Sequence, residues 1–120
     1  MPTTAAHQDK QSRTHLALSD LEQSQNSPQH ADWIVTLAFY KALHAVDSYL
    51  ATLEIHPKGH VTRNRSVRRY IEDIFPQYSA LYDASREARY ETYTYQDNPQ
   101  AVTGLVNDSV FIEEYINTLL

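Results

Sequence analysis

The stretch DWIVTLAFYKALHAVDSYLATLEI, residues 32–55, decides the fold class of this 120-residue chain. It contains no glycine or proline and is too long for one strand, so it predicts a single long helix. Lys41, Ser48 and Thr52 fall on the side of the helical wheel that we expect to face water. The opposite, broad face is apolar and should be buried, which would make this helix central; its members are Val35, Phe39, Leu43, Val46, Leu50 and Leu53.

Prolines divide the rest of the chain into further helices. We expect residues 1–8 to form a flexible tail and residues 9–120 to form one domain. Pro57 should lie near the first position of one helix, and Pro76 should close that helix. The content of two glycines and five prolines argues against a hairpin-rich β fold. The prediction is an all-α protein, an up-and-down bundle of four to five helices. The other predicted helices are residues 9–25, 57–75 and 77–92 and a last one from about residue 100, after a loop at 93–100.

Composition limits the chemistry and the location of the protein. The chain has no cysteine, so disulfides are excluded and a metal would need histidine and carboxylate ligands. Its start does not resemble a signal peptide, and no apolar run approaches the ~20 residues that cross a bilayer. We expect a cytoplasmic protein without a membrane partner. The net charge of −5 does not favour nucleic acid on average, but the positive charges are concentrated locally.

A polar stripe runs along the long helix. Tyr40, His44 and Asp47 are spaced i, i+4, i+7, so their side chains share one flank. Asp47 could orient the imidazole of His44 and raise its basicity, as a general base requires. The alternative is that all three are polar groups satisfied within a helix interface.

His60 and Arg63 form a second candidate pair, in the first turns of the following helix. A helix N-terminus disfavours a protonated histidine, so His60 should stay neutral. A neutral imidazole beside a permanent cation suits phosphodiester chemistry, as base and as phosphate clamp. The alternative is a core contact for His60 and a salt bridge for Arg63. The candidate catalytic residues are therefore His60, Arg63, His44 and Asp47.

We expect neither a metal nor another cofactor. His56 and His60 have the i, i+4 spacing of zinc ligands, but Pro57 lies between them. No HExxH pattern or second histidine pair of that kind accompanies them.

The segment TRNRSVRR, residues 62–69, suggests a nucleic-acid partner. Arg65, Arg68 and Arg69 could follow a phosphate backbone, and nine tyrosines in the chain could stack on unpaired bases. The alternative is an exposed helix face whose arginines pair with carboxylates.

The segment ASREARY, residues 84–90, places Ser85 and Arg89 on the core side of its helix. A buried guanidinium needs a carboxylate partner, and the candidate is Asp47 on the long helix. Tyr40, Ser85 and Arg89 are accordingly predicted to be structural polar residues.

Three segments taken in order resemble the HEPN superfamily (higher eukaryote and prokaryote nucleotide-binding). They are FYKALHAVDSYLA at 39–51, HPKGHVTRN at 56–64 and LYDASREARY at 81–90. The resemblance implies an all-α bundle, a homodimer, and a role in RNA cleavage or in a toxin–antitoxin or defence system with a nucleotidyltransferase. Active HEPN ribonucleases carry arginine followed four to six residues later by histidine. Here no histidine follows Arg63, and Arg13-Thr14-His15 is too closely spaced.

The sequence thus supports three hypotheses about function. The first is a HEPN-like protein that binds RNA or a nucleotide and forms the homodimer that the resemblance implies. The second is a metal-independent RNA endonuclease that uses His60 and Arg63. The third is a non-catalytic structural partner of a nucleotidyltransferase.

Overall fold

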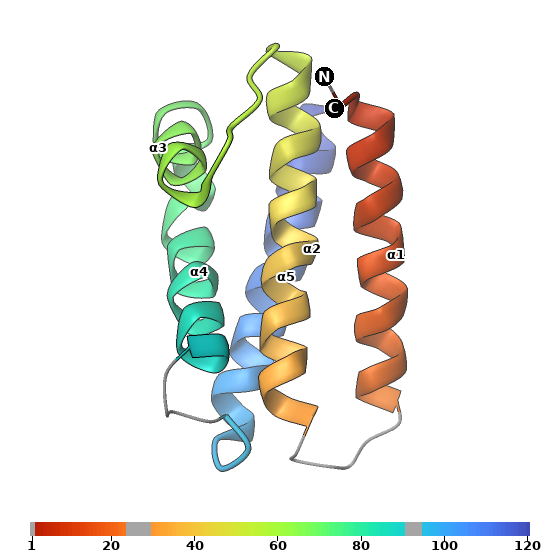
Figure 1. The fold of residues 1–120 in the computed structure, drawn as a ribbon, viewed down its shortest axis with the longest axis vertical. Helices are drawn as coiled ribbons and strands as arrows, with labels where there is room; N and C mark the ends of the chain where they lie inside the picture. The colour runs from red at the N-terminus through yellow and green to blue at the C-terminus, as the bar shows by residue number, and fades with distance from the viewer. Residues whose placement is uncertain (1, 24–29, 91–94) are drawn as a thin grey trace.

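The computed structural model describes residues 2–23, 30–90 and 95–120. It confirms the all-α bundle: the described residues form five α-helices and one short 3-10 turn, without a strand. Successive long helices run in opposite directions around α2, and the two chain ends lie at the same end of the bundle (Figure 1). The elements are α1 Thr4–Gln23, α2 Ala31–Thr52, α3 His60–Tyr70, η2 Glu72–Ile74, α4 Phe75–Tyr90 and α5 Pro99–Leu119.

α2 is the central helix, as the sequence predicts, because α1, α4 and α5 all pack against it. Its predicted apolar face is buried from Val35 to Leu50, whereas Leu53 is 41% exposed because the helix ends one residue earlier. The main core combines this face with apolar residues of every other helix. Its contributors from outside α2 are Leu18, Val67, Ile71, Ile74, Tyr78, Leu81, Ile112 and Ile116.

The predicted exposure of the polar side of α2 is wrong for two of its three residues. Thr52 is exposed as expected, but Lys41 is only 1% exposed and Ser48 is fully buried. The cause is α1, which lies along this side of α2. The hydroxyl of Thr4 on α1 donates a hydrogen bond to the carbonyl oxygen of Ser48. A polar side chain that a single-helix wheel assigns to water is thus covered by the neighbouring helix.

Several helix boundaries differ from the predicted ones. The segment expected to be a tail, residues 1–8, is helical from Thr4, and the predicted helix end at residue 25 lies outside the described residues. Pro57 lies in the linker before α3, whose N-cap is Gly59 in an extended conformation. Pro76 is the second residue of α4 and does not close the preceding helix. Proline is tolerated in a first turn, where its missing N–H breaks no helical hydrogen bond.

The part of the α4–α5 connection that the structure describes begins at Tyr95, which forms hydrogen bonds with α2 and α4. The backbone N–H of Tyr95 donates to Oδ1 of Asp32, and the Tyr95 hydroxyl donates to Glu87. The side chain of Asn98 caps α5 by accepting from the N–H of Ala101. In the described parts of the chain, no helix has both the length and the apolar character to cross a membrane.

Candidate functional site

An ion pair joins α2 to α3 at the predicted polar stripe. Nε of Arg63 donates to Oδ1 of Asp47 at 2.8 Å, and the two side chains are only 12% and 8% exposed. α3 begins just before Arg63, so the short linker after α2 folds back and brings the guanidinium to Asp47. Of the two sequence interpretations of Arg63, the salt bridge is the one that the structure contains.

His60, at the start of α3, packs against two aromatic rings. Its ring centroid lies 5.8 Å from that of Phe39 on α2 and 5.4 Å from that of Tyr82 on α4. Its Nδ1 is buried without a hydrogen-bond partner in the structure. Burial lowers the pKa of His60, and the charges of Arg63 and Arg89 lower it further, against an opposing effect of Asp47. The pKa therefore moves in the expected direction, mainly because of burial.

His44 behaves differently from the prediction. Burial lowers its pKa, and this effect exceeds the opposing influence of Asp47. The nearby positive groups Lys10, His7 and Arg63 lower the pKa further. Nδ1 of His44 has no hydrogen-bond partner, and the Asp47 carboxylate is bonded to Arg63. Asp47 does raise the pKa of His44, as expected, but the net pKa is lowered because desolvation disfavours the charged imidazole more strongly.

Arg89 also has a different partner from the predicted one. Its Nη1 donates to the hydroxyl of Tyr40, and its guanidinium carbon lies 5.3 Å from the centroid of that ring. The predicted partner Asp47 is taken by Arg63, which approaches from α3. Ser85 is fully buried, and neither its hydroxyl nor Nε of Arg89 has a hydrogen-bond partner in the structure. Among the described residues, Arg89 is thus held by the hydroxyl of Tyr40 and by no carboxylate.

The four candidate catalytic residues lie in one region of the molecule. Asp47 and Arg63 are in contact, and the charges of both act on His44 and on His60. Two further histidines lie beside this region: His56, which the sequence had paired with His60, and His7, which it had not connected with the site. His7 of α1 and His56 of the linker line a hollow of about 260 Å³ beside Asp47. Sequence reasoning assigned His7 to the tail, and no local pattern places it near Asp47, since only the docking of α1 does so.

Apart from Arg63, the arginines of α3 form no ion pair among the described residues. Arg65, Arg68 and Arg69 are exposed, and none of them forms a salt bridge with a carboxylate that the structure describes. The guanidinium of Arg68 lies over the ring of Phe75 and that of Arg69 over the ring of Tyr70, at 5.7 and 5.3 Å. The alternative interpretation, an arginine face neutralised by acids, is not what the described residues form.

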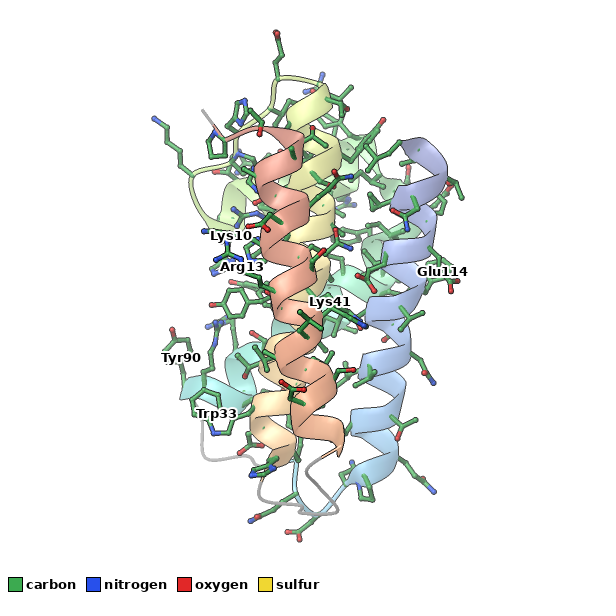
Figure 2. The ribbon with its side chains drawn as sticks, turned by 90° about the vertical axis from the view of Figure 1, so that its right-hand side faces the viewer. Lys10, Arg13, Trp33, Lys41, Tyr90 and Glu114 are labelled. Carbon is green, nitrogen blue, oxygen red and sulfur yellow. The ribbon has the colours of Figure 1, made fainter. Side chains whose placement is uncertain are left out.

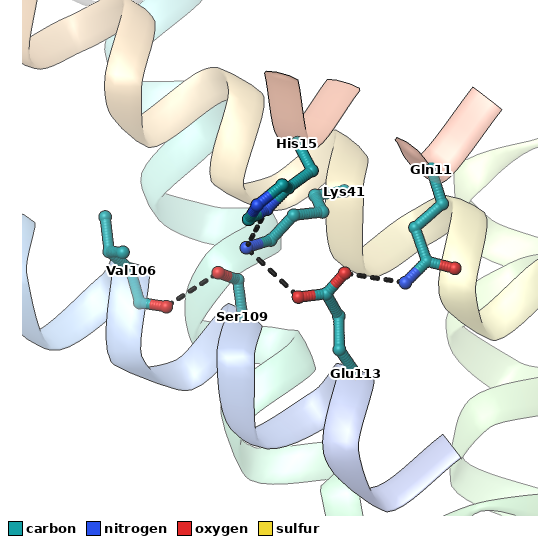
Figure 3. Close-up of polar contacts among 6 residues, drawn as sticks. All are labelled: Gln11, His15, Lys41, Val106, Ser109 and Glu113. Carbon is teal, nitrogen blue, oxygen red and sulfur yellow. Dashed lines mark hydrogen bonds and ion pairs between the residues drawn. The ribbon is translucent and has the colours of Figure 1, made fainter. Parts of the chain in front are cut away.

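A polar network around the buried Lys41 also connects α1, α2 and α5, and the sequence did not predict it. Nζ of Lys41 lies 3.1 Å from Glu113 and 3.5 Å from Nδ1 of His15, and Gln11 donates to the other oxygen of Glu113 (Figure 3). The network satisfies the buried ammonium from two helices that are far apart in the sequence. Spacing within one helix cannot predict this network, because its members come from three different helices.

Among the described residues, no group of three or more histidine, aspartate or glutamate side chains is arranged to hold a metal ion. Comparisons with protein-family models, with curated proteins and with solved structures find no match. The function must therefore be inferred from the residues themselves.

The lowered pKa values predict that acid destabilises the fold. In the folded protein His7, His44 and His60 all have pKa values below 6.5, so the unfolded chain binds more protons as the pH falls through this value. The free energy of unfolding, measured with urea, should therefore fall between about pH 7.5 and about pH 5.5. Asp108, whose pKa burial raises, acts in the opposite direction but is a single group.

The variant His44→Gln should reduce this pH dependence, since it removes one of the three contributing groups. An identical free energy of unfolding at both pH values would contradict the prediction.

Proposed function

We propose that the protein binds single-stranded RNA through the α3 arginine face, defined as Arg65, Arg68 and Arg69. The observation that carries the proposal is that these exposed guanidinium groups have no carboxylate partner among the described residues. The net charge of the chain is −5, yet the sequence of α3 contains four arginines and no acidic residue. Local positive charge on an acidic protein attracts a phosphate backbone to one face.

Aromatic rings beside the arginines support a single-stranded ligand. Tyr70 is 43% exposed at the end of α3, and Phe75 lies at the start of α4. Unpaired bases stack on such rings and on guanidinium planes, whereas a duplex keeps its bases stacked on one another. Because Arg68 and Arg69 already lie over aromatic rings, less side-chain entropy is lost when they meet a phosphate.

The triple variant Arg65→Ala, Arg68→Ala, Arg69→Ala should weaken RNA binding by about tenfold or more. Fluorescence anisotropy with a labelled single-stranded RNA measures this loss. The slope of log K against log salt should flatten by roughly 2, since each lost phosphate contact on a single strand removes ~0.7. Absence of RNA binding by the wild type at low salt would overturn the proposal and favour the structural partner of a nucleotidyltransferase.

A charge-matched control separates the α3 arginine face from net charge. Gln100, Thr103 and Asn107 are exposed on α5, which packs mainly against α2 and α4. Replacing all three with aspartate changes the net charge by the same three units. This control should retain most of the affinity. An equal loss in the control would show that the binding depends on overall charge.

The metal-independent endonuclease is a second candidate function. It is supported by the lowered pKa of His60 and by the neighbouring Arg63. If the wild type cleaves the RNA, His60→Ala should stop cleavage while leaving binding intact, because a neutral imidazole neutralises no phosphate. The homodimer that the resemblance implies stays a prediction, which sedimentation equilibrium can measure.

A further inference from the structure

One face of the central helix α2 is not covered by the bundle. Figure 1 shows α1 and α4 on either side of α2 and α5 behind it, with no described helix in front. Between residues 33 and 44 of α2, all side chains are buried except Trp33, Leu37, Tyr40 and His44. We call these four residues the α2 open face. They form one straight stripe along the helix, with the alternating four- and three-residue spacing by which one helix packs against another.

The two most exposed aromatic side chains that the structure describes lie at one end of this stripe. Trp33, the only tryptophan of the chain, is 64% exposed, and Tyr90 at the end of α4 is 77% exposed. Both project to the side of the bundle opposite α5 (Figure 2). Tryptophan, tyrosine and arginine are the residues that contribute most to the binding energy of protein interfaces. The rings therefore indicate a surface that a protein partner covers.

The α1 side of the α2 open face is cationic. Lys10 and Arg13 are exposed, and both project to the same side of the bundle as Trp33 (Figure 2). With Ala17 they line a shallow hollow of about 350 Å³ against Leu37. Apolar surface and positive charge thus lie next to one another between α1 and α2.

The α4 side of the same face is cationic as well. The guanidinium carbon of Arg89 lies 5.3 Å from the ring centroid of Tyr40 and 5.1 Å from that of Tyr90. Arg86 is exposed and lies over the ring of Tyr82 at 5.8 Å. Neither arginine forms an ion pair with a carboxylate that the structure describes. Positive charge therefore flanks the α2 open face from both sides.

The described acids of the same helices offset only part of this charge. Asp9 and Asp20 of α1 are exposed, so even if both face the stripe, the four cations remain in excess. The pair of Asp9 with Arg13 is screened by water, since both side chains are 66% exposed. The described acids of α2 and α4 form hydrogen bonds or line a separate hollow between α4 and α5; they are Asp32, Asp47, Asp83 and Glu87.

We propose that the α2 open face binds an acidic amphipathic helix of another protein. The apolar stripe of the partner packs on Trp33 and Leu37, and its carboxylates meet Arg13 on one side and Arg89 on the other. A helix suits this surface better than an extended peptide, because the described residues contain no strand to which a peptide could add. The inference does not rest on RNA binding, since none of these residues belongs to the α3 arginine face.

The probe is a synthetic helical peptide of about 18 residues, longer than the ~16 Å from Trp33 to His44. It carries leucine at alternating four- and three-residue spacing, glutamate on both flanks and no tryptophan. Because Trp33 is the only tryptophan of the protein, its fluorescence reports docking directly. The peptide should shift the emission to shorter wavelength as the ring leaves water. A version with lysine in place of each glutamate, and a scrambled version, should each bind at least about tenfold more weakly.

A charge variant tests the cationic flank. The double variant Lys10→Gln, Arg13→Gln should weaken binding of the labelled acidic peptide by about fivefold or more, measured by fluorescence anisotropy. The control Thr103→Asp, Asn107→Asp changes the net charge by the same two units at exposed positions on α5. The control should bind like the wild type. Equal losses in both proteins would reduce the effect to overall charge and contradict the proposal.

An aromatic variant tests the apolar stripe. Trp33→Ser should weaken peptide binding by about tenfold or more, while circular dichroism shows an unchanged helix content, because the ring is mostly exposed. The control is Leu16→Ser, which removes an apolar side chain that is 62% exposed and that lines another hollow, beside Glu113. The control should keep the wild-type affinity.

The α3 triple variant should bind the acidic peptide like the wild type, so a failure of RNA binding leaves this proposal standing. The proposal is wrong if the acidic peptide leaves the Trp33 emission unchanged, or if Trp33→Ser binds it as tightly as the wild type. A dimer that Trp33→Ser dissociates in sedimentation equilibrium would assign the face to a second copy of the chain. RNA or anionic phospholipid vesicles that displace the peptide from the wild type and from the α3 triple variant would assign the face to nucleic acid or to a lipid surface. Each of these assignments would overturn the proposed helix.

Discussion

Replacing Glu113 with alanine should lower the free energy of unfolding by about 3 kcal/mol, because it leaves a buried ammonium group without its carboxylate. The Lys41 side chain is 2% exposed, and Glu113 lies 3.1 Å from its Nζ. The contact with His15 is neither short nor with a carboxylate. Gln11 on α1 would lose its hydrogen-bond acceptor as well.

The matched comparison is the double variant Lys41→Met, Glu113→Leu. It removes both charges and fills a similar volume, so its stability should equal or exceed that of the wild type. Urea unfolding, monitored by circular dichroism, measures the free energy of unfolding of the wild type, of Glu113→Ala and of the double variant. If Glu113→Ala unfolds at the wild-type urea concentration, Lys41 must have another way to reach water or a partner.

The second large effect is expected at the ion pair between α2 and α3. Arg63→Ala should cost about 3 kcal/mol, since it strands the Asp47 carboxylate, which is 8% exposed. Arg89→Ala should cost only about 1 kcal/mol, because its hydrogen-bond partner is the neutral hydroxyl of Tyr40. The pairing predicted from the sequence, Arg89 with Asp47, would by the same argument place the larger cost at Arg89.

Arg65→Ala is the control for these two variants. Its side chain is exposed and forms no described ion pair, so its effect should stay within about 0.5 kcal/mol. Urea unfolding of the three variants ranks their losses in the free energy of unfolding directly. Equal losses for Arg63→Ala and Arg89→Ala would mean that Asp47 exchanges one arginine for the other.

Periodic apolar positions were predictable from the sequence because burial repeats with the period of the helix. Val67, Ile71 and Ile74 recur at helical spacing and are buried, as are Tyr78 and Leu81 on α4. The same reasoning identified α2 as the central helix. Local propensity also separated five helices at prolines and polar loops, with errors of a few residues at the ends where caps and first turns decide.

The partners of the polar residues in the candidate site could not be predicted in this way. A helical wheel correctly put Tyr40, His44 and Asp47 on one flank, but it could not say which arginine reaches Asp47. Arg63 and Arg89 both lie close enough to His60 to lower its pKa, but the linker between α2 and α3 brings Arg63 to Asp47, whereas Arg89 bonds to Tyr40. The choice depends on the relative placement of three helices, which no spacing within one helix encodes.

The sequence by itself determined that the chain forms helices, which face of α2 is apolar, and that α3 concentrates arginine. Only the tertiary structure decided that Lys41 is buried, that His7 joins His44 near Asp47, and that Arg89 bonds to Tyr40. The physical reason is that apolar burial follows a local period, whereas ion pairs and hydrogen bonds act over a few ångströms. Their partners come from α1, α3 and α5, which reach α2 only when the whole bundle packs.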